Sequence, residues 1–130
     1  MPAVSESMSR DLLTVDEKTP LVDAVRDMNK RRVGAALVLD GERLVGVFTE
    51  RDVLRAVAEG LTAAAMVGDW MTRGPETIEP EQPAEHAAVL MIHGGFRHLP
   101  VVETDGKVVG IVSIRDLMKV ALDDRSPRGV

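Results

Sequence analysis

The chain contains one segment twice, and this duplication limits its fold more than any other feature of the sequence. Seven residues recur at one constant offset: Met8, Arg10, Thr14, Pro20, Ala24, Met28 and Val38 correspond to Met71, Arg73, Thr77, Pro83, Ala87, Met91 and Val101. The offset grows by one residue after the first hairpin, where Gly46, Arg51 and Asp52 recur as Gly110, Arg115 and Asp116. Such a repeat indicates a duplicated supersecondary unit. Two units of this kind are expected to face each other across a pseudo-twofold axis that creates two related clefts.

The length of the chain decides how the two copies are expected to pack. With 130 residues the chain has the size of one compact domain, and a copy of about 60 residues is marginal for a hydrophobic core of its own. We therefore predict an α/β fold in which two pseudo-twofold related βαββα-type repeats share one core. Aromatic residues make up 2% of the sequence and Tyr is absent, so the core is expected to consist of Val, Leu, Ala, Ile and Met.

Each copy has the pattern helix, strand, strand, helix. In the first copy a helix begins with Thr19 as N-cap and ends at Arg31-Arg32, strands at 35–39 and 44–48 flank the turn Asp40-Gly41, and a second helix covers 49–58. In the second copy a helix begins at Pro83 and ends at Gly94-Gly95, and strands at 99–102 and 108–112 precede a helix at 113–122. The predicted limits are 8–60 for repeat 1, 61–75 for a linker with a helical turn at 63–67, 76–122 for repeat 2 and 123–130 for a flexible tail.

Composition argues against several functional classes. The net charge of −5 argues against nucleic-acid binding, which requires a basic surface to displace counterions. The chain has no Cys, and His86 and His93 stand without further metal-ligand partners, so we predict neither thiol chemistry nor a metal site. Residues 1–10 do not resemble a signal peptide, and no apolar run approaches the length of a membrane span, so a cytoplasmic location is expected.

One local motif occurs in both copies, where a strand ends in a hydroxyl residue and Asp follows three positions later. These are Thr49-x-x-Asp52 and Ser113-x-x-Asp116. A single occurrence would be interpreted as a capping box and nothing more. The same geometry also suits a ligand, because a helix N-terminus favours phosphate and a carboxylate in its first turn can accept hydrogen bonds from a ribose diol. Arg51 and Arg115 are placed to pair with phosphate oxygens.

A second feature, Arg97-His98-Leu99-Pro100-Val101, puts a cation and an imidazole at the start of a strand. The first copy has Gly34-Ala35 at the matching place, so the two clefts are expected to differ chemically. Taken alone, the Arg and His are interpreted as a solvated loop residue and a backbone-satisfied imidazole. Trp70 is interpreted as a buried anchor for the linker. No nucleophile-base set, P-loop or zinc-protease motif appears, so the chain is not expected to be an enzyme and no catalytic residue is assigned.

Four features of the chain are informative together: the doubled helix-strand-strand-helix order, the doubled Thr/Ser-x-x-Asp ending, the segment Arg97-His98-Leu99-Pro100-Val101, and the Met-Ser-Arg and Met-Thr-Arg segments. In this combination the chain resembles a tandem pair of CBS domains, also called a Bateman module. The resemblance covers residues 8–122 and is that of a stand-alone module. It implies two clefts for adenosine-containing ligands, each combining an Asp motif of one copy with residues of the other copy. One cleft would use Val47, Thr49, Arg51 and Asp52 with Thr77, Phe96, Arg97 and His98. The other would use Ile111, Ser113, Arg115 and Asp116 with Leu13, Val33 and Gly34.

The resemblance also implies a function. We expect a regulatory module that senses an adenine nucleotide such as AMP, ADP or ATP, with NAD and S-adenosylmethionine as further candidates. It needs no catalytic cofactor, and its effect is expected to pass through a homodimer or an unidentified protein target. The apolar faces expected to take part in the dimer include Val53, Leu54 and Val57, and Leu117, Met118, Val120 and Ala121. The alternative is a structural dimerisation or protein-interaction module with vestigial clefts.

Overall fold

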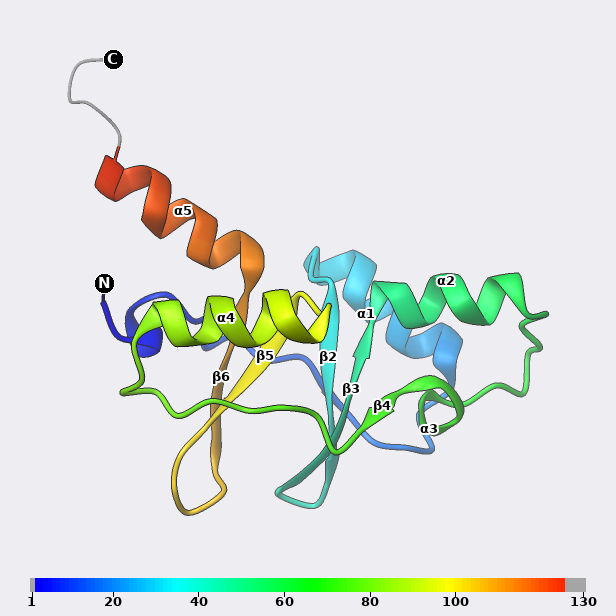
Figure 1. Ribbon diagram of the computed structural model, residues 1–130. Helices are drawn as coiled ribbons and strands as arrows, with labels where there is room; N and C mark the ends of the chain where they lie inside the picture. The colour runs from blue at the N-terminus through cyan, green and yellow to red at the C-terminus, as the bar shows by residue number, and fades with distance from the viewer. Residues whose placement is uncertain (1, 126–130) are drawn as a thin grey trace. The chain divides into compact units, whose positions relative to one another are not determined.

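A computed structural model describes residues 2–125 of the chain and divides into two compact units (Figure 1). The central unit consists of residues 12–75. The split unit combines residues up to Asp11 with those from Glu76 onward. Both units mix helices and strands, which confirms the predicted α/β class.

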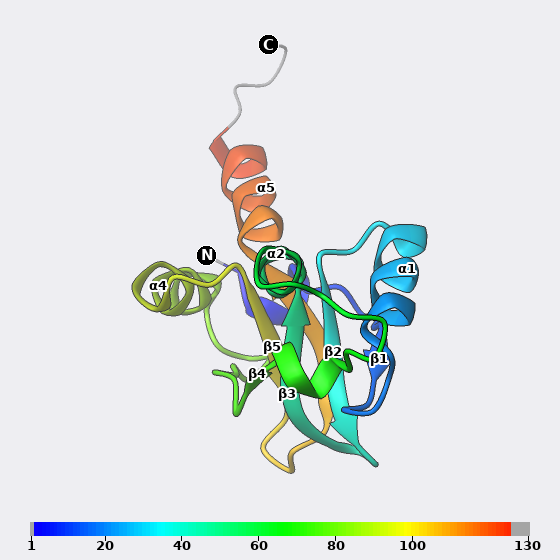
Figure 2. The same ribbon diagram turned by 90° about the vertical axis from the view of Figure 1, so that its right-hand side faces the viewer.

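The central unit is built on a four-stranded sheet with the strand order β1-β2-β3-β4. Its elements are β1 (Thr14–Val15), α1 (Leu21–Arg31), β2 (Ala35–Asp40), β3 (Arg43–Thr49), α2 (Glu50–Ala58), α3 (Val67–Trp70) and β4 (Thr72–Arg73). The antiparallel hairpin β2–β3 forms the middle of the sheet, β1 runs parallel to β2, and β4 runs antiparallel to β3 (Figure 2).

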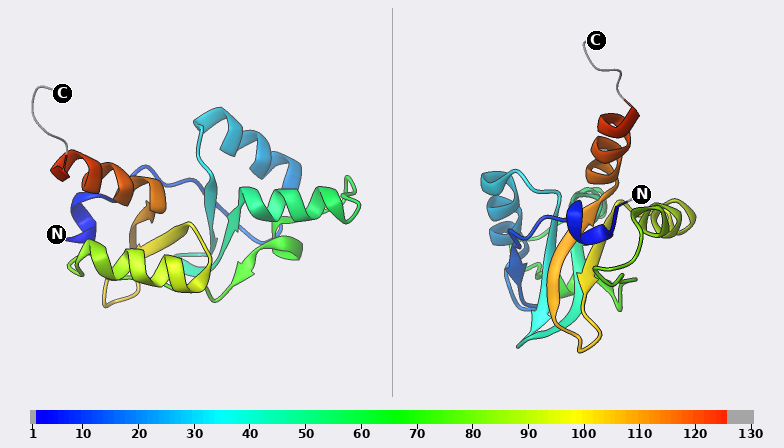
Figure 3. Two further views of the ribbon diagram at one scale, coloured as in Figure 1. Left: turned by 45° about the horizontal axis from the view of Figure 1, so that its top comes forward. Right: turned by 90° about the vertical axis from the view of Figure 1, so that its left-hand side faces the viewer.

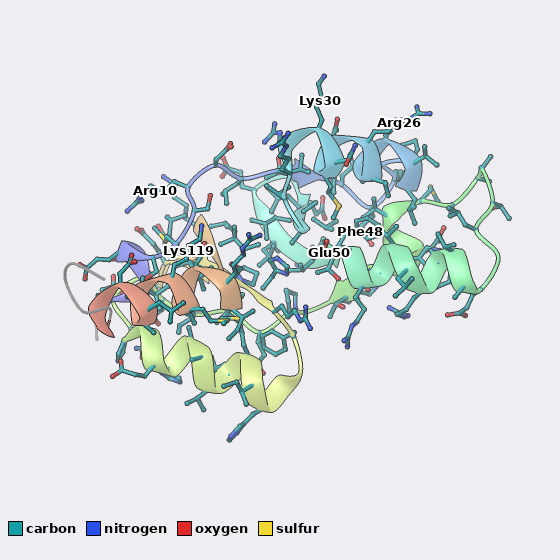
Figure 4. The ribbon with its side chains drawn as sticks, turned by 90° about the horizontal axis from the view of Figure 1, so that it is seen from above. Arg10, Arg26, Lys30, Phe48, Glu50 and Lys119 are labelled. Atoms are coloured by element: carbon teal, nitrogen blue, oxygen red, sulfur yellow. The ribbon has the colours of Figure 1, made fainter. Side chains whose placement is uncertain are left out.

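The core of the central unit lies between one face of this sheet and the helices α1 and α2. Phe48 is fully buried there, between the two helices in Figure 4. Leu21, Ala24 and Met28 of α1 reach the same cluster because their spacing puts them on one helix face. The opposite side of α1 carries Arg26 and Lys30, which are exposed and point outward (Figure 4).

The split unit repeats this architecture with shorter pairings (Figure 3). Its elements are the 3-10 turn η1 (Val4–Glu6), α4 (Ala84–Gly94), β5 (His98–Val102), β6 (Val108–Ser113) and α5 (Ile114–Arg125). The hairpin β5–β6 is extended on both sides by single bridges: Ile78 pairs parallel to Val101, and Ser9 pairs antiparallel to Ile111. A second buried cluster, which includes Val4, Met91, Leu99 and Val112, lies within this unit.

The segment that precedes each sequence repeat pairs with the hairpin of the other repeat. Thr72 and Arg73, which lead into the second repeat, pair with β3 of the first. Ser9, which leads into the first repeat, exchanges two backbone hydrogen bonds of 2.8 and 3.0 Å with Ile111 of the second. The compact units are therefore formed by a reciprocal exchange of edge segments between the two copies.

The exchanged segments explain why both copies carry Gly in the second strand of the hairpin. A Cβ on Gly46 would lie 2.8 Å from the Met71 sulfur and 2.8 Å from the Thr72 carbonyl oxygen. A Cβ on Gly110 would lie 2.5 Å from the Met8 sulfur. Each Gly thus leaves room for the Met of the edge segment beside it, and the duplicated Met and Gly of the sequence form two equivalent contacts.

The structure differs from the sequence predictions in several places. One cluster of buried side chains lies within each unit, and the exchanged segments and α3 contribute Val4, Val67 and Met71 to these clusters. Pro20, not Thr19, is the N-cap of α1, since the Thr19 hydroxyl instead accepts a hydrogen bond of 3.1 Å from the Asp16 backbone.

Three further differences concern the ends of elements. The helical turn predicted at 63–67 lies at 67–70, and the strands β1 and β4 were not predicted. The last helix continues through Arg125, so residues 123–125 of the expected flexible tail are helical, and 126–130 lie outside the described residues. Trp70, interpreted as a buried anchor, is only partly buried against the core of the central unit.

Candidate functional site

The duplicated motif lies at two strand-to-helix junctions, where β3 leads into α2 and β6 leads into α5. Side chains alternate across a sheet, so Val47 and Thr49 face away from the core that contains Phe48. Ala35 and Leu37 pair with Thr49 and Val47 on that same face. Ile111 and Ser113 occupy the equivalent positions on β6, opposite Pro100 and His98. The predicted ligand-binding residues of each hairpin thus share the sheet face that is directed away from its core.

The first junction holds a buried carboxylate. Asp52 is 3% exposed, and its Oδ2 atom accepts hydrogen bonds from the Thr49 backbone N–H (2.8 Å) and the Thr49 hydroxyl (3.2 Å). Its Oδ1 atom accepts a hydrogen bond from Arg55 Nη1 at 2.9 Å, which is also an ion pair. The Arg55 guanidinium lies 5.7 Å from the centroid of the Trp70 ring. This carboxylate therefore caps α2 and is paired with a cation.

The second junction has the same capping box and a more accessible carboxylate. Asp116 Oδ2 accepts a hydrogen bond from the Ser113 backbone N–H at 2.9 Å, and the Ser113 hydroxyl accepts one from the Asp116 N–H at 3.1 Å. Asp116 is partly buried. Among the described residues no cation pairs with it and no donor occupies its Oδ1 atom. The two junctions share their backbone geometry and differ in how fully the carboxylate is satisfied.

Other predicted residues of the central unit surround the first junction. The Gly34 carbonyl accepts a hydrogen bond from the Glu50 N–H at 3.0 Å, which fixes Gly34 beside the first residue of α2. Val33 packs against the core, and the buried Leu13 accepts a hydrogen bond from Leu37. Arg51 is exposed in the first turn of α2.

The split unit places its predicted residues in the same arrangement. The Arg97 carbonyl accepts a hydrogen bond of 2.9 Å from the Ile114 N–H, as Gly34 does from Glu50, and His98 pairs with Ser113. Phe96 packs against the core of this unit. Thr77, Arg97 and Arg115 are exposed. Arg97 thus occupies the place of Gly34, which accords with the alignment of the two copies.

Within each unit the structure brings the Asp motif together with the residues of the same repeat that precede its hairpin. The grouping implied by the resemblance, in which Asp52 acts with Arg97 and Asp116 acts with Gly34, combines residues of both units and stays a prediction. Sequence reasoning missed Arg55 as the cationic partner of Asp52. Its spacing of three residues from Asp52, on the same helix face, was the available signal.

No group of three or more His, Asp or Glu side chains within residues 2–125 is arranged to hold a metal ion. No helix in that part of the chain has both the length and the apolar character needed to cross a membrane.

Comparison with known proteins identifies the family. The CBS domain family matches the chain twice, over residues 4–59 and 67–123. The chain therefore belongs to the CBS domain family and is a tandem CBS domain pair. A 17.7 kDa protein of Acidianus ambivalens is 33% identical over 121 residues, which are 92% of this chain and 73% of that protein. Several other curated relatives are longer, and the chain spans 43% of one and 19% of another.

Solved structures show the same fold with ligands bound. The CBS domain protein PAE2072 of Pyrobaculum aerophilum, complexed with AMP, is 31% identical, with a TM-score of 0.82 and coverage of 92% of this chain and 98% of that one. The CBS domain pair of MJ0100, in complex with 5′-methylthioadenosine and S-adenosyl-L-methionine, is 25% identical, with a TM-score of 0.84 and the same coverage. These neighbours support the assignment of a ligand-binding regulatory module.

Proposed function

We propose that the chain senses an adenosine-containing nucleotide, AMP, ADP or ATP, through the carboxylates of Asp52 and Asp116. The observation that carries this proposal is the pair of carboxylates at equivalent strand-to-helix junctions, in a family with a member solved in complex with AMP. In this proposal each carboxylate accepts hydrogen bonds from a ribose diol. The positive end of the following helix favours phosphate.

The remaining predicted residues are assigned by their chemistry. Arg51 and Arg115 are exposed in the first helical turn, where a guanidinium can pair with phosphate oxygens. Val47 and Ile111 offer apolar contact to the base. Arg97 has no cationic counterpart in the first repeat, and we assign phosphate recognition to it together with Asp52. The module is regulatory in this proposal, and turnover of ATP by the purified chain would contradict that assignment.

The first experiment identifies the ligand. Thermal unfolding is measured with AMP, ADP, ATP, NAD and S-adenosylmethionine, because a ligand that binds only the folded state stabilises it by RT ln(1 + [L]/Kd). A concentration of 100 times Kd corresponds to about 2.7 kcal/mol. We expect an adenine nucleotide to raise Tm most. No shift with any of the five compounds would contradict the proposed function.

The second experiment assigns the binding residues. Asp52→Asn and Asp116→Asn keep the size of each side chain and remove the charge that strengthens hydrogen bonds from the diol. A hydrogen bond to a charged group contributes about 1.5–3 kcal/mol, so each variant is expected to weaken nucleotide binding at its junction about 10- to 100-fold in calorimetry. Asp69→Asn is the matched control, since Asp69 caps α3 through the Met66 N–H at 3.0 Å. Unchanged affinity in the double variant would rule out both carboxylates.

The alternative is a structural dimerisation module with vestigial clefts. One observation favours it: Asp52 already has protein partners on both oxygen atoms, as a purely capping carboxylate would. The ligand panel separates the two functions, because a structural module gains no stability from nucleotide. The observation that favours ligand binding is Asp116 Oδ1, for which the described part of the chain supplies no donor.

We also infer that the chain forms a homodimer. In the split unit α4 and α5 contact each other and expose Val89, Ile92, Met118 and Leu122, with Ile92 70% exposed. On α2 of the central unit, Leu54 and Val57 are exposed as well. A second copy would cover such apolar side chains in an isologous contact. Of the residues named from the sequence, Leu117 is buried in the core of its own unit and Val53 packs partly against the other core.

A further inference from the structure

We propose that Arg55 is a gate on the Asp52 junction, so that a nucleotide binds there only by displacing it. This inference rests on the proposed function, since it concerns how the same carboxylate becomes available. Its basis is the set of contacts among Thr49, Asp52, Arg55 and Trp70, which all belong to the central unit.

The hydrogen-bonding capacity of the carboxylate limits what Asp52 can accept. Each carboxylate oxygen offers about two lone pairs. Both lone pairs of Oδ2 are used by Thr49, and one of Oδ1 is used by Arg55. A ribose diol donates two hydrogen bonds, and the side chain of Asp52 is only 5% exposed. Rotation of the Thr49 hydroxyl would leave one acceptor position on each oxygen, enough for the two hydrogen bonds of a diol. The obstacle is space, because the Arg55 guanidinium lies against Oδ1 at 2.9 Å and must move aside for the diol to reach the carboxylate.

Arg55 is held by a second contact on its other side. Its guanidinium lies over the Trp70 ring, at a distance within the range of a cation–π interaction. The Arg55 side chain is 52% exposed, so it can leave the carboxylate for water without crossing the core. Trp70 thus favours the closed position, and the exposed side of Arg55 allows the open one.

The second junction has the same backbone and no gate. Lys119 stands at the position equivalent to Arg55, and Ser7 stands at the position equivalent to Trp70. Lys119 is exposed on α5 (Figure 4), and among the described residues it makes no ion pair with Asp116. Within residues 2–125 no donor reaches the Oδ1 atom of Asp116. The two junctions are therefore expected to differ in mechanism, because a bound cation must leave the carboxylate before nucleotide binds at Asp52 and none must leave at Asp116.

AMP is the probe for the test, and Asp116→Asn is the background that leaves only the Asp52 junction. On this background Arg55→Gln is expected to raise AMP affinity about five- to tenfold, the fold-change that an ion pair and a cation–π contact correspond to. Trp70→Phe keeps an aromatic ring with a weaker hold on the cation and is expected to give about a two- to threefold gain. Lys119→Gln on an Asp52→Asn background is the matched control and is expected to change nothing.

Trp70 supplies an independent readout because it is the only Trp of the chain. If AMP displaces Arg55, the emission of Trp70 changes in the Asp116→Asn variant and stays constant in the Asp52→Asn variant. The emission of ligand-free Arg55→Gln should already resemble that of the nucleotide-saturated Asp116→Asn variant.

The outcomes separate the gate from the function. If Arg55→Gln leaves AMP affinity unchanged or lowers it on the Asp116→Asn background, Arg55 is no gate, although binding at either junction would still support the proposed function. If Asp116→Asn abolishes detectable binding, recovery with Arg55→Gln supports the gate, and no recovery overturns it. If the wild-type chain binds none of AMP, ADP and ATP, the proposed function and the gate are overturned together.

Discussion

At the scale of single residues, the same carboxylate serves both capping and the proposed binding. Asp52 and Asp116 accept hydrogen bonds from the backbone N–H of the residue before their helix, at 2.8 and 2.9 Å. Capping typically contributes about 1 kcal/mol to stability. Each carboxylate nevertheless has further acceptor capacity, so the two interpretations of the motif are compatible. What distinguishes the junctions is the side chain three residues later, Arg55 or Lys119.

Arg97 is expected to discriminate between nucleotides and the nucleoside. Because its guanidinium would pair with phosphate and not with the ribose, Arg97→Ala should weaken ATP and ADP binding about tenfold or more in calorimetry, and adenosine binding far less. Arg26→Ala, which removes an exposed Arg from α1, is the control and should have no effect.

The partner of Arg97 can be identified by combining variants. Arg97→Ala is combined in turn with Asp52→Asn and with Asp116→Asn. If Arg97 and one of these Asp residues contact the same nucleotide, their losses of nucleotide affinity should be non-additive. The resemblance predicts coupling to Asp52. Equal losses for adenosine and ATP would instead show that Arg97 has no role in phosphate recognition.

At the scale of elements, short edge segments complete both sheets. β4 has two residues and Ser9 forms a single bridge, and each is directly preceded by a Met that packs over a Gly of the neighbouring strand. These segments are distant in sequence from the strands they join. Met71 packs over Gly46 and Met8 packs over Gly110, so both edges are joined by the same kind of contact.

Gly46→Ala is expected to destabilise the fold by about 1–3 kcal/mol, the cost of overpacking a buried site. Gly46 has no positive φ, so the cost comes from the new methyl group against the Met71 sulfur and the Thr72 carbonyl. Urea denaturation of the ligand-free chain measures this change in the free energy of unfolding.

A double-variant cycle separates the two clashes of Gly46→Ala. Met71→Ala removes the flexible Met side chain, so it should restore part of the stability lost in Gly46→Ala. The part of the loss that the Thr72 carbonyl oxygen causes should remain. A change below about 0.5 kcal/mol for Gly46→Ala alone would contradict this explanation.

At the scale of the whole molecule, the exposed apolar side chains of α4 and α5 are the basis of the proposed homodimer. The chain mass is 14.1 kDa, and light scattering at micromolar concentration is expected to report about twice that value. The double variant Ile92→Lys and Met118→Lys places two charges on the apolar α4–α5 surface and should give the monomer mass.

The control for this variant is Asp27→Lys, a change of charge at an exposed position of α1. It should leave the dimer intact. A monomer mass for the wild-type chain, both with and without AMP, would contradict the homodimer.

The sequence by itself determined the duplicated hairpins, the four main helices and the two capped Asp motifs, because each depends on local signals: helical spacing, Asp-Gly turns and a hydroxyl residue three positions before Asp. Tertiary structure alone decided the exchange of edge segments, the Met–Gly contacts and the separate buried cluster of each unit. Strands of two residues have no periodicity, and their pairing depends on contacts between residues far apart in sequence. The contact of Arg55 with Trp70 is of the same kind, since only folding brings α3 beside α2.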